Sequence, residues 1–162
     1  MKSLILIRHA KSDWGTHLSD IDRPIKPSGA ADARNVATEL SKSLPSSYVV
    51  WSSVAKRAYE TCTIFAREWS YSPDKIVWID KLYTFDGDVL ESIIRTASDA
   101  DETLVLFGHN EGITEFVNKF GNIYLDNVPT AAAVMIKFDT SSWRTITKGQ
   151  TILTLFPRDL RS

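Results

Sequence analysis

The 162-residue sequence predicts an α/β fold in which helices cover both faces of a mostly parallel central sheet. Two observations lead to this prediction. Short apolar runs without alternation, such as residues 4–7, are typical of strands that are buried on both faces. Segments with apolar residues at helical spacing separate these runs, so strand and helix alternate through most of the chain. Internal repeats, low-complexity segments and a domain boundary are absent, and we expect one domain over residues 1–162.

The first half of the chain predicts two strands and two helices. Residues 4–7 form the first strand, and the polar loop 11–27 that follows is long enough to suggest a functional role. Ser28 is suited to cap the first helix. Its apolar face comprises Ala33, Val36, Ala37 and Leu40. Residues 48–51 predict the second strand, and the second helix begins near Ala55. The apolar face of that helix comprises Ala58, Cys62, Phe65, Ala66 and Trp69.

The second half predicts four more strands and two more helices. Residues 76–79 form a short strand, and Asp88 with Glu91 resembles the capping box of a third helix. Residues 103–107 form the fourth strand, and a helix that ends at Gly121 follows it. The last two strands are expected at residues 132–138 and 151–156.

Composition excludes several classes of function. The formal net charge is -1 and there is no long run of Lys or Arg, so we expect no binding to nucleic acid or to an anionic membrane. Apolar stretches are too short to cross a bilayer or to serve as a signal peptide, which favours a cytoplasmic protein. The single cysteine, Cys62, cannot form an internal disulfide, and its helical spacing indicates a core residue.

Polar groups follow three of the predicted strands, where the carboxyl ends of neighbouring strands share one edge of the sheet. These groups are Arg8, His9, Ser53, Arg57, His109 and Asn110. Two guanidinium groups and two imidazoles at one edge predict a local anion site, and the planar guanidinium suits phosphate. One histidine is able to act as a nucleophile while the other stabilises charge. A metal site is the competing use of two histidines, but two adjacent arginines would repel a cation.

Three segments resemble the signature segments of the histidine phosphatase superfamily. They are Leu-Ile-Arg-His-Ala at the N-terminus, the segment from Trp51 to Thr61, and Phe-Gly-His-Asn-Glu-Gly at residues 107–112. Finer matches at residues 8–14, 22–29, 108–110 and 129–131 are similar to the short Six-type phosphohistidine phosphatases, a bacterial-type branch. The resemblance covers nearly the whole chain. It implies a three-layer α/β/α fold of the phosphoglycerate mutase-like type, without a cap domain.

The resemblance also implies a mechanism without metal or other cofactor. His9 would be the nucleophile that becomes phosphorylated, and Arg8, Arg57 and His109 would bind the phosphoryl oxygens. His9 must be neutral to attack, which flanking positive charge should favour, whereas His109 would be more useful protonated. Ser53 and Asn110 are candidates for orienting the phosphate, and structural capping is an equally good interpretation of both.

The sequence departs from the wider superfamily in its proton donor. Many members carry an acidic residue at one of two positions, and here no carboxylate matches cleanly, although Asp13, Asp80 and Asp86 stay open as candidates. An alkoxide leaving group needs a proton donor far more than an imidazole does. The missing acid therefore favours phosphohistidine as the substrate, and the lack of a cap favours a phosphohistidine presented on another protein.

Two other classes of function stay open. One alternative is a phosphatase or mutase for small phosphate esters. The other is a module that binds phosphate or a partner protein without catalysis. The first rival predicts turnover of a small phosphorylated substrate, and the second predicts anion binding without turnover. The oligomeric state is left open, and a monomer is compatible with the sequence.

Overall fold

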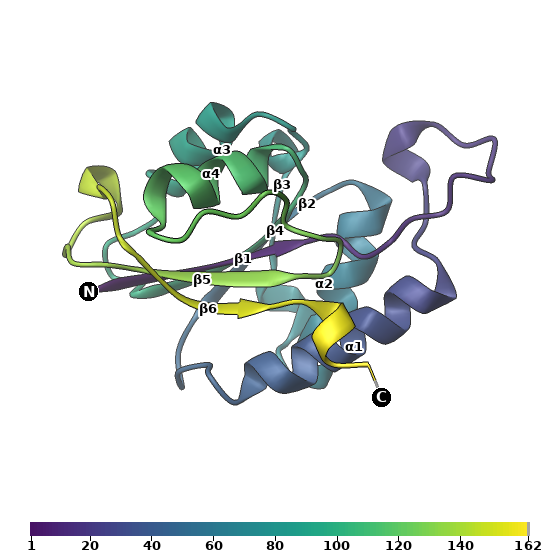
Figure 1. Ribbon diagram of the computed structural model, residues 1–162, viewed down its shortest axis with the longest axis horizontal. Coiled ribbons are helices and arrows are strands. Elements are labelled where there is room, and N and C mark those ends of the chain that lie inside the picture. The colour runs from purple at the N-terminus through teal and green to yellow at the C-terminus, as the bar shows by residue number, and fades with distance from the viewer. Residues whose placement is uncertain (162) are drawn as a thin grey trace.

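The protein is an α/β sandwich with one six-stranded sheet between two pairs of helices, as the computed structural model shows (Figure 1). The structure describes residues 1–161. The strands are β1 (Lys2–Arg8), β2 (Val49–Ser53), β3 (Val77–Ile79), β4 (Thr103–Gly108), β5 (Ala133–Phe138) and β6 (Gln150–Leu155). The helices are α1 (Pro27–Ser41), α2 (Lys56–Glu68), α3 (Gly87–Ile94) and α4 (Gly112–Phe120). Short 3-10 turns include η1 (Asp20–Asp22) and η3 (Asp80–Leu82).

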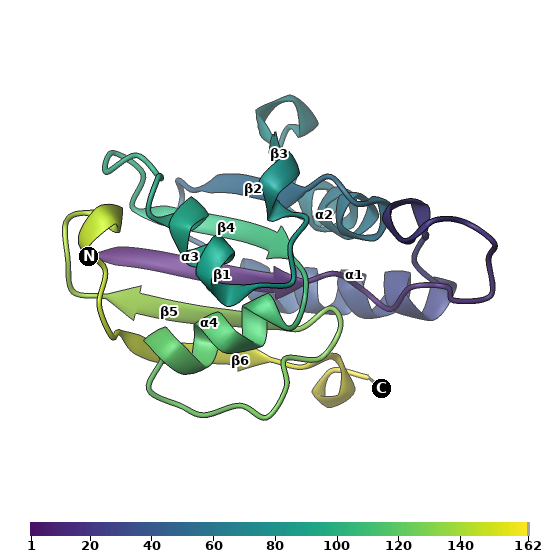
Figure 2. The same cartoon turned by 90° about the horizontal axis from the view of Figure 1, so that it is seen from above.

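The sheet is mostly parallel, as predicted, and its strand order is β3-β2-β4-β1-β5-β6. Strands β1, β2, β3 and β4 pair in parallel, whereas β5 and β6 add an antiparallel edge. Figure 2 shows the strands from above, with α3 and α4 over the sheet and α1 below it. The carboxyl ends of β1, β2 and β4 therefore reach one side of the molecule together.

Two hydrophobic clusters hold the layers together, and β1 contributes to both. Leu4 and Leu6 pack towards α3 and α4, whereas Ile5 and Ile7 pack towards α1 and α2. All four side chains are fully buried, which explains why this run shows no alternation of apolar and polar residues. Cys62 is a buried core residue in the second cluster, as its spacing predicted.

Two predicted helix caps are wrong. Helix α1 begins at Pro27, so Ser28 lies inside its first turn and Lys26 is the residue before it. Proline suits this position because its missing N–H has no intrahelical partner there. Helix α3 begins at Gly87, and the Asp86 carboxylate accepts a hydrogen bond from the Asp88 N–H. Gly121 ends α4 as expected.

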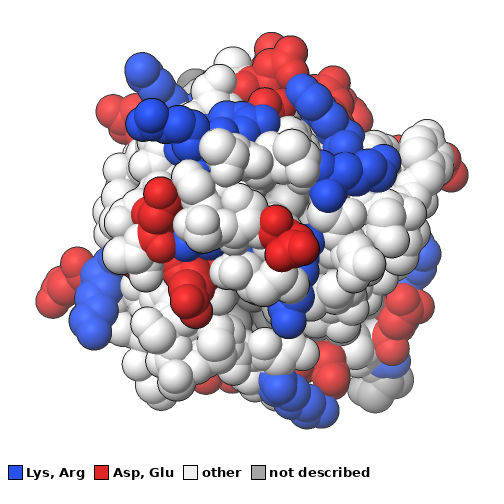
Figure 3. Space-filling model, turned by 90° about the vertical axis from the view of Figure 1, so that its left-hand side faces the viewer, with Lys and Arg blue, Asp and Glu red and all other residues white. Residues whose placement is uncertain are grey.

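Charges of both signs are interspersed on the face at the amino ends of the central strands, opposite the edge that carries the predicted site (Figure 3). This view shows scattered Lys, Arg, Asp and Glu side chains among larger neutral areas. Among residues 1–161, no helix combines the length and the apolar composition needed to cross a bilayer.

Candidate active site

The parallel register of β1 and β4 brings the two predicted site histidines side by side. Arg8 is the register partner of Gly108, so His9 and His109 leave adjacent strands at the same level. Their ring centroids are 5.3 Å apart. The Ala131 N–H, which lies within hydrogen-bonding distance of the carbonyl oxygens of both Arg8 and His9 (3.0 Å each), fixes the backbone at this point.

The His9 imidazole presents an unprotonated nitrogen to the site. Its Nδ1 lies 2.7 Å from the Ala10 carbonyl oxygen, which can only accept a hydrogen bond, so Nδ1 carries the proton. Burial lowers the pKa of His9 to about 3, and the positive charges of Arg57, Arg8 and Arg23 act in the same direction. His9 is therefore neutral near pH 7, with a lone pair on Nε2, and burial is the main cause.

The His109 imidazole is also buried and neutral. Burial, followed by the neighbouring His9 and Arg57, lowers its pKa to about 3. The expectation of a protonated His109 is therefore wrong for this arrangement, because a buried imidazolium beside positive charges is costly. Its Nε2 lies 2.7 Å from Ser53 Oγ, while Nδ1 is buried without a hydrogen-bond partner.

Ser53 contacts His109 and does not line the cavity formed by Arg8, His9 and Arg57. It ends β2, is fully buried, and its Oγ accepts a hydrogen bond from the Ala55 N–H at 3.2 Å. Its hydroxyl hydrogen is then free to point at His109 Nε2, and in that tautomer His109 Nδ1 is a donor. Ser53 thus contacts a site residue and is placed to set the proton position on its ring.

The two predicted arginines have different partners. Arg8 Nη1 donates to the Val128 carbonyl at 3.0 Å, and its Nε is buried without a partner. Arg57, from the first turn of α2, donates from Nε to His9 Nε2 at 3.4 Å. A cation in the first turn opposes the helix dipole, and here the Asp20 carboxylate lies against it as counter-ion.

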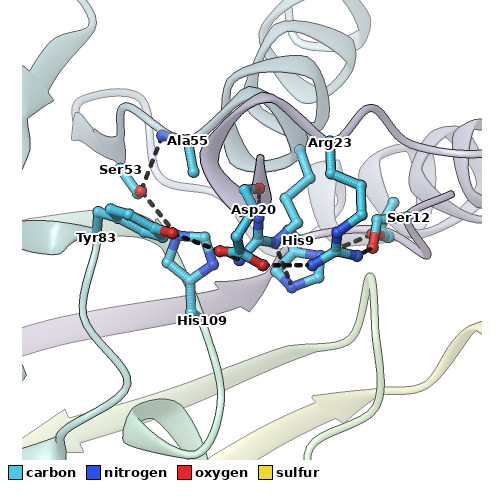
Figure 4. A network of polar contacts seen from close by, with 10 residues as sticks. His9, Ser12, Asp20, Arg23, Ser53, Ala55, Tyr83 and His109 are labelled. Carbon is cyan, nitrogen blue, oxygen red and sulfur yellow. Dashed lines mark hydrogen bonds and ion pairs between the residues drawn. The ribbon is translucent and has the colours of Figure 1, made fainter. Parts of the chain in front are cut away.

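Asp20 is the centre of a polar network that the sequence did not reveal (Figure 4). Its carboxylate contacts Arg57 Nη2 at 3.0 Å and Arg23 Nη2 at 2.8 Å, and it accepts a hydrogen bond from the Tyr83 hydroxyl. Partial burial raises the pKa of Asp20, but the hydrogen bonds from Tyr83, Arg23 and Arg57 outweigh it and hold that pKa well below its usual range. Asp20 is thus an ionised carboxylate in the site.

Arg23 is a third site arginine that the sequence analysis missed. It is buried, donates from Nη1 to Ser12 Oγ, and its guanidinium stacks 3.5 Å from the ring centre of Trp14. Two sequence signals pointed towards it: the resemblance over residues 22–29, and the charged cluster from Asp20 to Arg23 within a long loop of candidate functional importance. Such a loop has no periodicity from which its shape can be read.

A cavity of about 520 Å³ lies beside these side chains, and His109 and Ser53 are not among the residues that line it. Arg8, His9 and Arg57 line it, together with Asn110. The Asn110 side-chain Oδ1 also accepts hydrogen bonds from the backbone N–H and the hydroxyl of Thr114 in the first turn of α4, so this residue combines a wall position with a capping role. The aromatic rim is open, with Trp14 77% and Phe85 51% exposed.

The three carboxylates left open by the sequence do not line this cavity. Asp13 Oδ1 accepts from the Gly15 N–H, Asp86 caps α3, and Asp80 begins η3. Among residues 1–161, no group of three or more His, Cys, Asp or Glu side chains is arranged to hold a metal ion. The donors that do converge are guanidinium and imidazole nitrogens, which suit an anion.

Comparisons with known proteins relate this chain to one superfamily. The model of the histidine phosphatase superfamily (branch 1) matches residues 4–82, which include His9 and Arg57. An uncharacterised chloroplastic protein of Arabidopsis thaliana is 31% identical over 151 residues, or 88% of this chain and 69% of that protein.

Two solved structures share the fold. The protein histidine phosphatase SixA complexed with tungstate has a TM-score of 0.83 and 16% identity, covering 98% of this chain and 99% of that chain. A mycobacterial glucosyl-3-phosphoglycerate phosphatase has a TM-score of 0.69 and 15% identity, covering 94% and 98%. These two proteins share the fold, but their names record different substrates.

Proposed function

The chain belongs to the histidine phosphatase superfamily, and from this premise we propose that it is a metal-independent phosphatase acting on phosphohistidine in another protein. His9 is the nucleophile and forms a phosphohistidine intermediate. Arg8, Arg57 and His109 bind the phosphoryl oxygens.

One observation carries this proposal: two buried donors without a partner belong to residues that adjoin the neutral His9 imidazole. Arg8 Nε and His109 Nδ1 are buried without a partner, although buried polar groups are normally hydrogen-bonded. Both residues adjoin His9, whose Nε2 carries a lone pair. A phosphoryl group at His9 would supply acceptor oxygens to these donors.

The proposed reaction has two steps. The substrate imidazole is first protonated by solvent on its free ring nitrogen; His9 Nε2 then attacks phosphorus while the bond to the substrate nitrogen breaks, and neutral imidazole leaves. Water then attacks the phosphorus, the bond to Nε2 breaks, and inorganic phosphate leaves with His9 neutral again. Phosphoryl transfer requires mainly positioning and charge stabilisation, which the arginines and His109 supply.

The protonation states support phosphohistidine over a phosphate ester. Asp20 is the carboxylate of the polar network, and it is ionised by its hydrogen bonds to Tyr83, Arg23 and Arg57, so it has no proton to donate in this arrangement. An alkoxide leaving group needs such a donor, whereas an imidazole does not. The exposed rim of Trp14 and Phe85 leaves room for a side chain that projects from a partner protein.

A substrate panel tests the proposal. Phosphate release is measured from a carrier protein phosphorylated on histidine and from sugar phosphates and other small esters. We expect kcat/KM to be at least about a hundredfold higher for phosphohistidine, to be lost in His9→Ala, and to persist in His17→Ala, which changes an exposed loop histidine. Efficient turnover of an ester with none of phosphohistidine would establish the small-ester phosphatase instead. Phosphate binding without any turnover would establish a binding module.

A further inference from the structure

Asp20 contacts Arg57 through its carboxylate and through its backbone carbonyl. Arg57 Nη1 donates to the Asp20 carbonyl oxygen at 2.7 Å, and Arg57 Nη2 contacts the Asp20 carboxylate at 3.0 Å. The third nitrogen, Nε, donates to His9 Nε2 at 3.4 Å. Each of the three Arg57 nitrogens thus has one partner within the protein.

Two donors on residues that adjoin His9 are without a partner. Arg8 Nε and His109 Nδ1 are buried and have no partner. The site is therefore asymmetric: the side built by β1 and β4 presents free donors, and the side built by α2 is neutralised by a carboxylate from η1.

Asp20 is also the exposed partner of this ion pair. Its side chain is 42% exposed, whereas the Arg57 side chain is 3% exposed. The carboxylate can turn into solvent without burying its charge, but the guanidinium cannot leave without breaking the packing of α2. An incoming anion would therefore displace Asp20 and keep Arg57 in place.

We propose, on the basis of the phosphoryl site assigned above, that Asp20 is a specificity-determining residue: an internal carboxylate ligand of Arg57 that an entering anion must displace. A dianionic phosphoryl group offers Arg57 the same paired contact and adds charge and a third oxygen for Arg8 and His109. A carboxylate or another monoanion offers Arg57 the same contact as the Asp20 carboxylate, without additional charge. The site thus rejects abundant monoanions and binds product phosphate less tightly than its three arginines would allow.

Binding of inorganic phosphate, measured by titration calorimetry, tests the proposal without reference to turnover. We expect Asp20→Asn to bind phosphate at least about tenfold more tightly than wild type, because one charge-assisted contact no longer competes. The matched control is Asp22→Asn, which removes the same charge from the same turn. Asp22 contacts Ser19 rather than an arginine, so the phosphate affinity of the Asp22→Asn variant should stay within about twofold of wild type.

Acetate gives a second, independent readout. Asp20→Ala leaves a carboxylate-sized space beside Arg57, so acetate should bind this variant and compete with phosphate. Acetate should not compete with phosphate for the wild-type protein. Equal phosphate affinity in wild type and Asp20→Asn, with both proteins folded by circular dichroism, overturns the proposal and leaves the proposed function intact. Acetate that accelerates Asp20→Ala instead of inhibiting it also overturns the proposal, because Asp20 would then be an acid–base group. Absence of phosphate binding in every protein refutes the phosphoryl site itself.

Discussion

Replacing Ser53 by alanine should weaken the fold and the site together, because Ser53 Oγ has two buried partners. It lies 2.7 Å from His109 Nε2 and accepts the Ala55 N–H at 3.2 Å. Removing it leaves both groups without these partners at a fully buried position. Each buried unsatisfied group costs roughly 1–3 kcal/mol, so the loss of both contacts should lower the free energy of unfolding by about 2–6 kcal/mol.

Activity should fall beyond this loss of stability. Without Ser53 the proton of His109 is no longer held on Nδ1, so we expect kcat to fall at least about tenfold at temperatures where the variant is folded. Urea unfolding and the kcat–KM split are the measurements. The control is Ser52→Ala, a buried neighbour whose hydroxyl donates to the Ser53 carbonyl and does not contact His109. If both variants lose equal stability and Ser53→Ala keeps wild-type kcat, the positioning role is refuted.

Three further predictions concern the residues around the site. The pKa of both His9 and His109 is about 3 in the folded protein, so the unfolded chain binds more protons than the folded chain between about pH 6.5 and 3. The free energy of unfolding should therefore rise with pH in that window, by up to about 1.4 kcal/mol per pH unit for each histidine, and level off above it. Urea unfolding across this range checks the slope, which His109→Asn should reduce; an unchanged slope contradicts the buried neutral state. Gly29→Ala would place a methyl group 2.6 Å from the Lys11 carbonyl oxygen, and calorimetric unfolding should show a loss of about 1–3 kcal/mol rather than a neutral change. Burial raises the pKa of the Cys62 thiol to about 12, so iodoacetamide should label it only after denaturation, and labelling of the native protein would contradict its core position.

The sequence predicted the sheet and the convergence of the two histidines because both depend on strong local patterns. A run such as residues 4–7 is apolar on both faces only if helices cover both, and parallel strands bring their carboxyl ends to one edge. Once β1 and β4 are neighbours, the register places His9 beside His109 without further information.

The polar network around Asp20 could not be predicted in the same way. Asp20 and Tyr83 are 63 positions apart, in two aperiodic segments, and they meet only because η1 folds back over α2. The helix caps failed for a related reason. Asp86 and Asp88 are both suited to cap α3, and only the tertiary position of the preceding loop selects Asp86.

The protonation of His109 was mispredicted because sequence gives charge but not burial. An imidazole beside a phosphoryl group gains from a positive charge, which led to the expectation of a protonated ring. In the structure both imidazoles are buried and next to arginines, and both effects favour the neutral form. A neutral ring still supplies a donor through Nδ1 when Ser53 holds its other nitrogen.

The most direct test of the account is whether His9 carries the phosphoryl group during turnover. Wild type, His9→Ala and His17→Ala are mixed with a carrier protein bearing radiolabelled phosphohistidine and quenched in alkali within one turnover. The account predicts a transient label on wild type and His17→Ala that decays as phosphate appears, and no label on His9→Ala. Phosphate release by wild type without any labelled enzyme, or equal labelling of His9→Ala, would contradict the nucleophilic role of His9.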